Sequence, residues 1–212
     1  MFDPEPGRPE AHPEAHPEAH PEAHGGAASV ALGIDPGLTR CGYGAVVRTG
    51  ARATVLDVRV LRTDPALALP ERLATLQADL EQLIARSRPA VVVVERVLFQ
   101  NNARTAIAVG QASGLALATA ARSGVPVVQY SPNEVKLAVT GDGRADKRAV
   151  QSMVTRLLRL TAAPEPPDAA DALALALCHL WRSRVSDAAG TTPTSDRFDA
   201  AVRAAFAREA RR

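Results

Sequence analysis

The first half of the chain contains short apolar runs that predict β-strands. Val30–Ile34 and Gly42–Val47 lie on either side of a Pro-Gly turn and predict two paired strands. Thr54–Thr63 alternates between apolar and polar positions and predicts a third strand, in which Leu56 and Val58 share one face. Because the connections between the three runs are short, we expect an antiparallel meander.

The second half alternates between helical periodicity and short buried strands. The pattern predicts helices at about 70–88, 102–122, 133–139, 147–160 and 168–181, and strands at 91–95 and 125–130. The run of four valines that begins at Val91 is typical of a strand buried on both faces. We therefore predict an α/β fold with a mixed five-stranded sheet, in which three antiparallel strands are followed by two parallel ones and helices cover both faces.

The regions outside this pattern divide the chain into three parts. Residues 10–24 contain four Glu-Ala-His units separated by Pro, and such a repeat has no means of building a core. We predict that residues 1–28 are a disordered acidic tail, although four histidines at this spacing also suit loose binding of a transition metal. Residues 29–182 are predicted to form the folded domain, and residues 183–212 a linker with a short C-terminal helix.

The formal charge of +2 hides an asymmetry between the tail and the rest. Residues 1–28 have six acidic side chains and one arginine, or −5, so the remainder carries +7. A basic domain suits a polyanionic partner such as nucleic acid. The only lysines among 25 basic residues are Lys136 and Lys147, and their scarcity suggests that each has a specific role; the alternative is chance.

Several function classes are disfavoured by composition. No apolar run approaches the roughly 20 residues that span a bilayer, and the N-terminus has no apolar signal-peptide core. Cys41 and Cys178 lack metal or disulfide spacing. We therefore expect a soluble cytoplasmic protein with no membrane partner.

Four acids are placed where they can meet. Asp35 and Glu95 each end a predicted buried strand, whereas Asp168 and Asp171 share one face at the start of a predicted helix. Taken singly, Asp168 suits a helix N-cap and Asp171 suits the positive end of the helix dipole. Taken together, the four carboxylates suit divalent cations and two-metal hydrolysis of a phosphodiester.

The segments 32–44, 94–102, 110–114 and 168–174 carry a resemblance that extends from about Val30 to Trp181. They read LGIDPGLTRCGYG, VERVLFQNN, GQASG and DAADALA. In this order and spacing they resemble the RuvC family, the bacterial Holliday-junction resolvases of the ribonuclease-H-like superfamily. The resemblance implies an endonuclease of DNA recombination and repair, which resolves the junction by symmetric, metal-dependent hydrolysis of two opposed strands.

The resemblance also implies roles for the four acids. Asp35, Glu95, Asp168 and Asp171 would be the catalytic residues and the ligands of two Mg²⁺ ions per site, with Mn²⁺ as a substitute. Family members have Asp or His where this chain has Asp168.

DNA contacts and partners follow from the same resemblance. The implied contacts are Leu98, Phe99, Asn102, Arg104, Lys136, Arg144, Lys147 and Arg148. Leu98 and Phe99 would form an apolar wedge that unstacks bases, or else pack into the core at the strand end. A homodimer is implied around helix 102–122, where Ile107, Gly110 and Gly114 form a closely packing face; the alternative is that this face packs on the sheet. RuvA and RuvB are implied as further partners.

Three other functions remain open. Gly33-Ile-Asp-Pro-Gly37 is similar to the first phosphate loop of actin-like ATPases, but no second such subdomain is present. The second alternative is a junction-binding protein without activity, although all four acids are retained. An RNA-directed nuclease is the third.

Overall fold

A single mixed sheet forms the centre of the protein. The computed structural model describes residues 29–96 and 103–189, with side chains described for 29–96 and 105–183. Its strands are β1 (Ser29–Asp35), β2 (Arg40–Thr49), β3 (Arg52–Arg62), β4 (Val91–Glu95) and β5 (Val127–Tyr130). In the order β3-β2-β1-β4-β5, the first three strands are antiparallel, and β4 and β5 run parallel to β1. This is the predicted topology.

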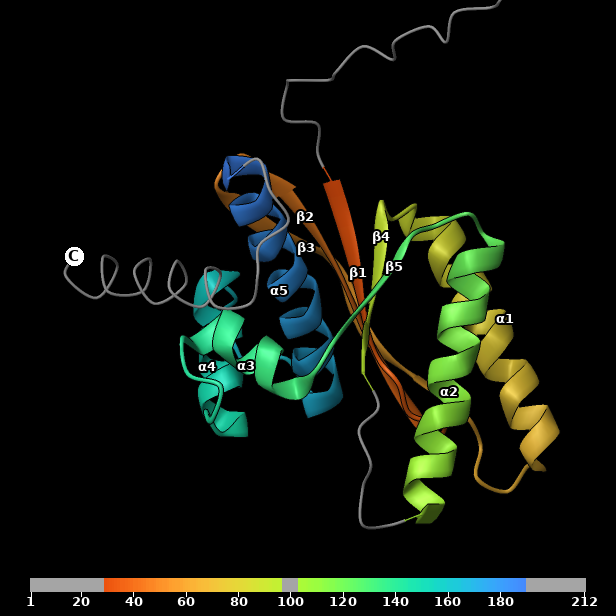
Figure 1. Cartoon of the computed structure of the whole chain (residues 1–212). Helices are drawn as coiled ribbons and strands as arrows, with labels where there is room; N and C mark the ends of the chain where they lie inside the picture. The colour runs from red at the N-terminus through yellow and green to blue at the C-terminus, as the bar shows by residue number, and fades with distance from the viewer. Residues whose placement is uncertain (1–28, 97–102, 190–212) are drawn as a thin grey trace, which may run out of the picture.

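Helices cover both faces of the sheet, as predicted (Figure 1). They are α1 (Leu69–Ser87), α2 (Ala103–Arg122), α3 (Pro132–Thr140), α4 (Lys147–Leu157) and α5 (Pro167–Ala189). The pair α1 and α2 lies on one face, whereas α3, α4 and α5 lie on the other (Figure 1). In the part of the chain that the structure describes, no helix has the length and hydropathy needed to cross a membrane.

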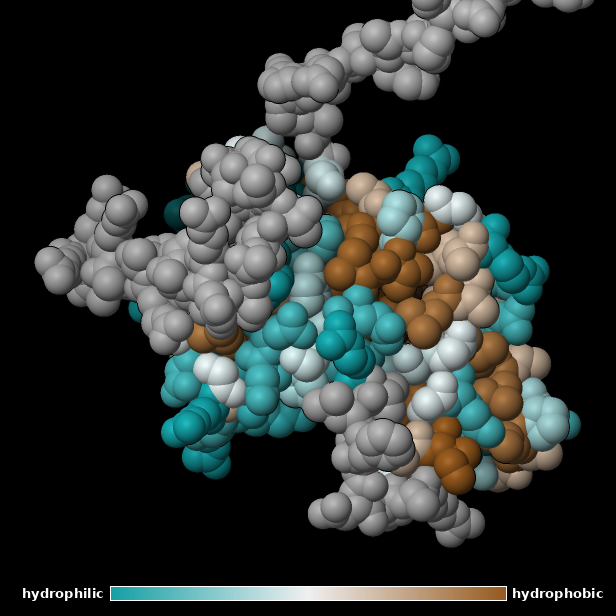
Figure 2. Space-filling model, in the orientation of Figure 1, coloured by the Kyte–Doolittle hydropathy of each residue, from teal (hydrophilic) through white to brown (hydrophobic). Residues whose placement is uncertain are grey.

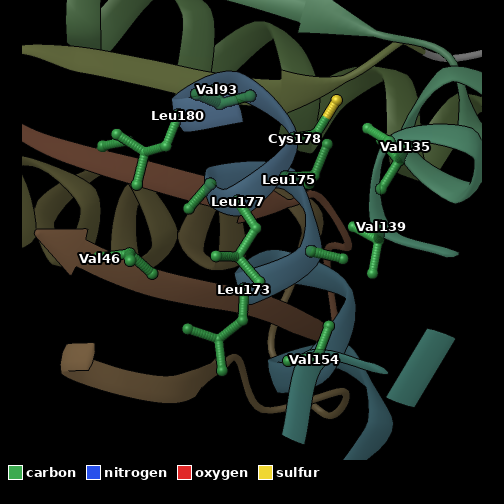
Figure 3. Close-up of a cluster of buried hydrophobic side chains, with 14 of the residues drawn as sticks. Val46, Val93, Val135, Val139, Val154, Leu173, Leu175, Leu177, Cys178 and Leu180 are labelled. Atoms are coloured by element: carbon green, nitrogen blue, oxygen red, sulfur yellow. The ribbon is translucent and has the colours of Figure 1, made fainter. Parts of the chain in front are cut away.

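The two faces of the sheet have separate apolar cores. Leu173 and Leu177 of α5 pack with Val46 and Val93 on one face (Figure 3). Leu32 is wholly buried in the core beneath α1 and α2 on the other face. Burial of each such side chain contributes about 1.5–3 kcal/mol. Central strands buried on both sides explain why β1 and β4 read as unbroken apolar runs.

Local signals define the helices that flank the site. Ser131 and Glu134 form a capping box at the start of α3, and Gly141 ends that helix with a left-handed φ of 79°. The side chain of Asp146 accepts a hydrogen bond from the Ala149 N–H and caps α4. Lys147 is therefore placed in the first turn of α4.

Two predictions about elements are wrong. Val46 pairs with Val55 and Ala45 pairs with Asp57, so a bulge leaves Leu56 as an extra residue. Leu56 is consequently 55% exposed and does not share a buried face with Val58. The last helix does not end near residue 181 but continues to residue 189, into the predicted linker.

Candidate active site

Asp35 and Glu95 meet at one edge of the sheet. Ile34 pairs with Val94 in the parallel ladder between β1 and β4, and the two acids are the next residues of their strands. Both side chains line a cavity of about 320 Å³. Parallel strands thus bring together carboxylates that are 60 residues apart in the sequence.

Glycines in β1 and β2 allow α5 to approach the same edge. A Cβ at Gly33 would overlap the carbonyl oxygen of Ala172, and one at Gly42 would overlap that of Asp168. The first turns of α5 therefore lie directly against the sheet backbone, because neither strand has a side chain there. This close contact determines how near Asp168 and Asp171 lie to the ends of the strands.

The two aspartates of α5 have different surroundings. Asp171 lines the cavity with Asp35 and Glu95, and its Oδ2 lies 2.8 Å from Lys147 Nζ. Lys136 lines the same cavity, so both lysines of the chain lie there. Asp168 does not line it; its Oδ2 lies 3.4 Å from Arg40 Nε.

Asp168 is not the N-cap of α5. The helix begins at Pro167, so Asp168 lies inside the first turn. Its Oδ2 is buried and accepts no hydrogen bond from the described residues. Since a buried carboxylate oxygen without a hydrogen bond is costly, this atom is suited to a ligand that supplies positive charge.

The carboxylates are close enough to alter one another's ionisation. Burial, followed by repulsion from Glu95, Asp171 and Asp168, raises the pKa of Asp35 from 3.8 to about 7. Burial and the charge of Asp171 also raise the pKa of Glu95. The hydrogen bond to Asp171 raises the pKa of Lys147. The site therefore holds more negative charge than its own lysines neutralise.

No three His, Cys, Asp or Glu side chains in residues 29–96 and 105–183 already form a metal-binding group. Two of the four acids are engaged by cations of the chain instead, Asp171 by Lys147 and Asp168 by Arg40.

Comparison with known proteins identifies the family to which a chain with these four acids belongs. The family model for crossover junction endodeoxyribonuclease RuvC matches residues 31–179, which include the sheet from the third residue of β1 onward and all four acids. The chain belongs to the RuvC family. The predicted family is thereby confirmed.

Individual relatives agree with the family model. The crossover junction endodeoxyribonuclease RuvC of Salinispora arenicola is 56% identical over 152 residues, which cover 71% of this chain and 87% of the relative. The Thermus thermophilus RuvC solved with a Holliday junction substrate is 40% identical, with a TM-score of 0.71 over 74% of this chain and 96% of that chain. The yeast mitochondrial Holliday junction resolvase Ydc2, 15% identical, shares the fold with a TM-score of 0.52 over 71% of this chain and 78% of that one.

The DNA contacts implied by the RuvC resemblance are only partly described. Leu98, Phe99 and Asn102 lie outside the described residues, and Arg104 is described only by its place in α2. Arg144 is exposed in the loop between α3 and α4. Arg148 is exposed in the first turn of α4 and borders a shallow hollow separate from the acidic cavity.

The structure adds three residues to the site that were not among those predicted from the sequence. Arg40 holds the carboxylate of Asp168, while Gly33 and Gly42 admit α5. The two glycines could have been recognised from the sequence, because glycine inside a strand often marks close approach of another backbone. The pairing of Arg40 had no such signal because it depends on the packing of α5.

Proposed function

We propose that this protein resolves four-way DNA junctions by nicking two opposed strands symmetrically, with Asp35, Glu95, Asp168 and Asp171 as the catalytic acids. The observation that carries the proposal is the convergence of Asp35, Glu95 and Asp171 in one cavity at the sheet edge, within a match to the RuvC family. That match favours nuclease activity over the actin-like ATPase and RNA-directed alternatives.

The four acids suit divalent metal ions. Carboxylate oxygens are the preferred ligands of Mg²⁺ and Mn²⁺, and the buried Oδ2 of Asp168 has no hydrogen bond within the described part of the chain. The pKa of Asp35 is raised by burial and then by repulsion from the neighbouring carboxylates, and a bound cation would relieve both. We assign two Mg²⁺ ions to these residues, with Mn²⁺ as a substitute. When bound, they would supply an activated water and stabilise charge on the leaving oxygen.

Lys147 and Lys136 position the phosphate in this proposal. An ammonium group has three N–H donors, so Lys147 can hold the Asp171 carboxylate and also contact a phosphate oxygen. Lys136 lines the same cavity, and its charge partly offsets the rise in the pKa of Glu95 that burial and Asp171 cause. Both lysines therefore favour the ionised form of the acids, although burial and mutual repulsion outweigh them, and both attract the polyanionic substrate.

The remaining junction contacts stay predictions. Arg144 and Arg148 are exposed on the loop and helix next to Lys147, where they can contact the DNA backbone. Leu98 or Phe99 is proposed as the wedge, with Asn102 and Arg104 beside it.

We also propose a homodimer through α2. Ile107 is 62% exposed, and a Cβ at Gly110 or Gly114 would meet no atom of the described residues within 4 Å. The alternative, in which these glycines pack on the sheet, is disfavoured because Ala112 and Ala116 occupy that side of the helix. Figure 2 shows hydrophobic residues on the surface where α2 lies in Figure 1. A twofold dimer would match the two equivalent strands of a junction.

RuvA and RuvB remain predicted partners, and the cytoplasm remains the predicted location. Both rest on the sequence.

The proposed function is tested by incubating the full chain with a labelled mobile four-way junction and with a linear duplex of matched sequence. We expect paired nicks at symmetric positions in the junction, dependent on Mg²⁺ or Mn²⁺ and abolished by EDTA, with the duplex left intact. Junction binding without nicks in either metal would support the inactive junction-binding alternative instead.

A further inference from the structure

A hollow of about 810 Å³ lies between the β2–β3 hairpin, the end of α4 and α5. Arg48, Arg52, Arg156 and Arg159 line it, with Leu177 and Trp181 among the apolar side chains. Ser29, the first residue of β1, pairs with Arg48, whereas Asp35 ends the same strand. The hollow is therefore at the opposite end of the sheet from the acidic cavity.

The charged residues that line this hollow in the described part of the chain are all arginines. No acidic residue within the described ranges lines it, and Arg52, Arg156 and Arg159 are exposed and form no ion pair with a described acid. Arg48 donates a hydrogen bond to the Leu180 carbonyl oxygen at 3.0 Å. Because Arg52, Arg156 and Arg159 gather here without a described carboxylate, the hollow favours an anionic occupant.

We propose that residues 1–28 of the same chain bind this hollow. The segment has a net charge of −5, opposite in sign to the four arginines. It joins β1 at Ser29, beside Arg48, and the hairpin pair Thr49–Arg52 is next to it. The anionic segment thus leaves the fold at the edge of the basic hollow.

Because residues 1–28 are covalently joined to the domain, a weak attraction is sufficient for them to occupy the hollow. A segment joined directly to its binding surface has an effective concentration on the order of 1 mM, so millimolar intrinsic affinity gives substantial occupancy. Surface charge pairs contribute little singly, and several acting together are needed. The six acids of the segment, spread over residues 3–22, provide that multiplicity.

The apolar part of the hollow favours the N-terminal segment over DNA as the occupant. The segment repeats Pro and Ala every four residues, and proline-rich chains dock against aromatic side chains. Trp181 and Leu177 offer such a surface between the arginines. A phosphate backbone would use the arginines alone.

The test measures contact between the segment and Trp181, the only tryptophan of the chain. Ala15→Cys in the full chain takes a bimane dye, which tryptophan quenches on contact, while Cys41 and Cys178 are buried. At pH 8 and low salt we expect quenching that is lost in the Trp181→Phe background. In about 1 M salt, where the screening length is ~3 Å, we expect the quenching to fall at least twofold.

A matched pair of variants separates the hollow from general charge. Arg156 and Arg86 each lie in the last turn of a helix and are exposed, but only Arg156 lines the hollow. Arg156→Glu is expected to reduce the quenching at least twofold, and Arg86→Glu to leave it unchanged.

Three results would overturn the proposal. The first is bimane emission that is the same with Trp181 and with Trp181→Phe. The second is quenching that disappears on dilution, which would assign the hollow to the segment of a second copy. The third is absent quenching combined with weaker junction binding by Arg156→Glu, which would assign the hollow to DNA.

Discussion

Among the acids of the site, Asp35 has the pKa that burial and neighbouring charge raise most. Its pKa rises to about 7 because it is buried and because Glu95, Asp171 and Asp168 repel its ionised form, with Lys147 only partly compensating. Folding therefore favours the protonated carboxyl over the ionised one. In the absence of metal, this residue opposes folding at neutral pH.

Asp35→Asn is expected to stabilise the metal-free protein in a pH-dependent way. The cost of Asp35 is absent below its unfolded pKa of 3.8, grows as pH rises and levels off above the folded pKa near 7. The variant should therefore gain stability from pH 5 to pH 8, reaching on the order of 4 kcal/mol. Urea denaturation in EDTA measures this difference.

Asp79→Asn on α1, which does not line the cavity, is measured beside it as the control for the substitution itself. A gain for Asp35→Asn that is equal at pH 5 and pH 8 would contradict the electrostatic explanation.

Lys147→Gln should slow junction cleavage roughly tenfold or more, with a smaller change in junction affinity. The substitution removes the 2.8 Å ion pair with Asp171 and a charge from the phosphate side of the cavity. Loss of a charged hydrogen bond costs about 1.5–3 kcal/mol, and each 1.36 kcal/mol of barrier is tenfold in rate. Single-turnover cleavage at saturating protein gives the comparison, and a wild-type rate would remove Lys147 from the mechanism.

At the scale of elements, the periodicity of apolar residues was sufficient to predict a strand or helix that buries one regular face. The helical spacing of α1 was predictable for this reason, and the apolar run of β4 was predictable because that strand is buried on both faces. The Leu56 bulge was not, because alternation along a strand carries no information about an extra residue opposite its partner.

The site could be predicted from the sequence for a different reason. Acids at the ends of buried strands indicated the sheet edge, but the adjacency of β1 and β4 required the family resemblance. The engagement of Asp168 by Arg40 could not be predicted, since it depends on how deeply α5 sits against Gly42.

Gly42→Ala should therefore impair both folding and cleavage. Its Cβ would overlap the carbonyl oxygen of Asp168, so the start of α5 has to move away from the sheet. Overpacking of this kind costs about 1–3 kcal/mol, and displacement of Asp168 and Asp171 should lower cleavage more than stability alone explains.

Gly143→Ala is the matched control, because a Cβ there would make only ordinary van der Waals contacts, 3.5 Å from the Asn133 carbonyl oxygen and 3.9 Å from the Leu137 Cβ. Urea denaturation and junction cleavage are measured on both variants. Wild-type behaviour of Gly42→Ala would refute the close approach of α5.

At the scale of the whole molecule, the exposed face of α2 should form the dimer. Ile107→Asp places a charge on this face and should convert the dimer to a monomer that still folds. Leu56→Asp is the matched control, since Leu56 is 55% exposed and Ile107 62%, on different elements. Sedimentation velocity distinguishes the outcomes; an unchanged dimer for Ile107→Asp, or a monomeric wild type, would contradict the assignment.

The central claim is that the carboxylate cluster around Asp35 cleaves junction DNA rather than only binding near it. The most direct measurement compares the wild type with Asp35→Asn for both binding and cleavage of one four-way junction in Mg²⁺. We expect junction binding to be retained and cleavage to fall below detection, because Asp35 lies in the cavity with Glu95 and Asp171. Cleavage by Asp35→Asn at the wild-type rate would contradict the account.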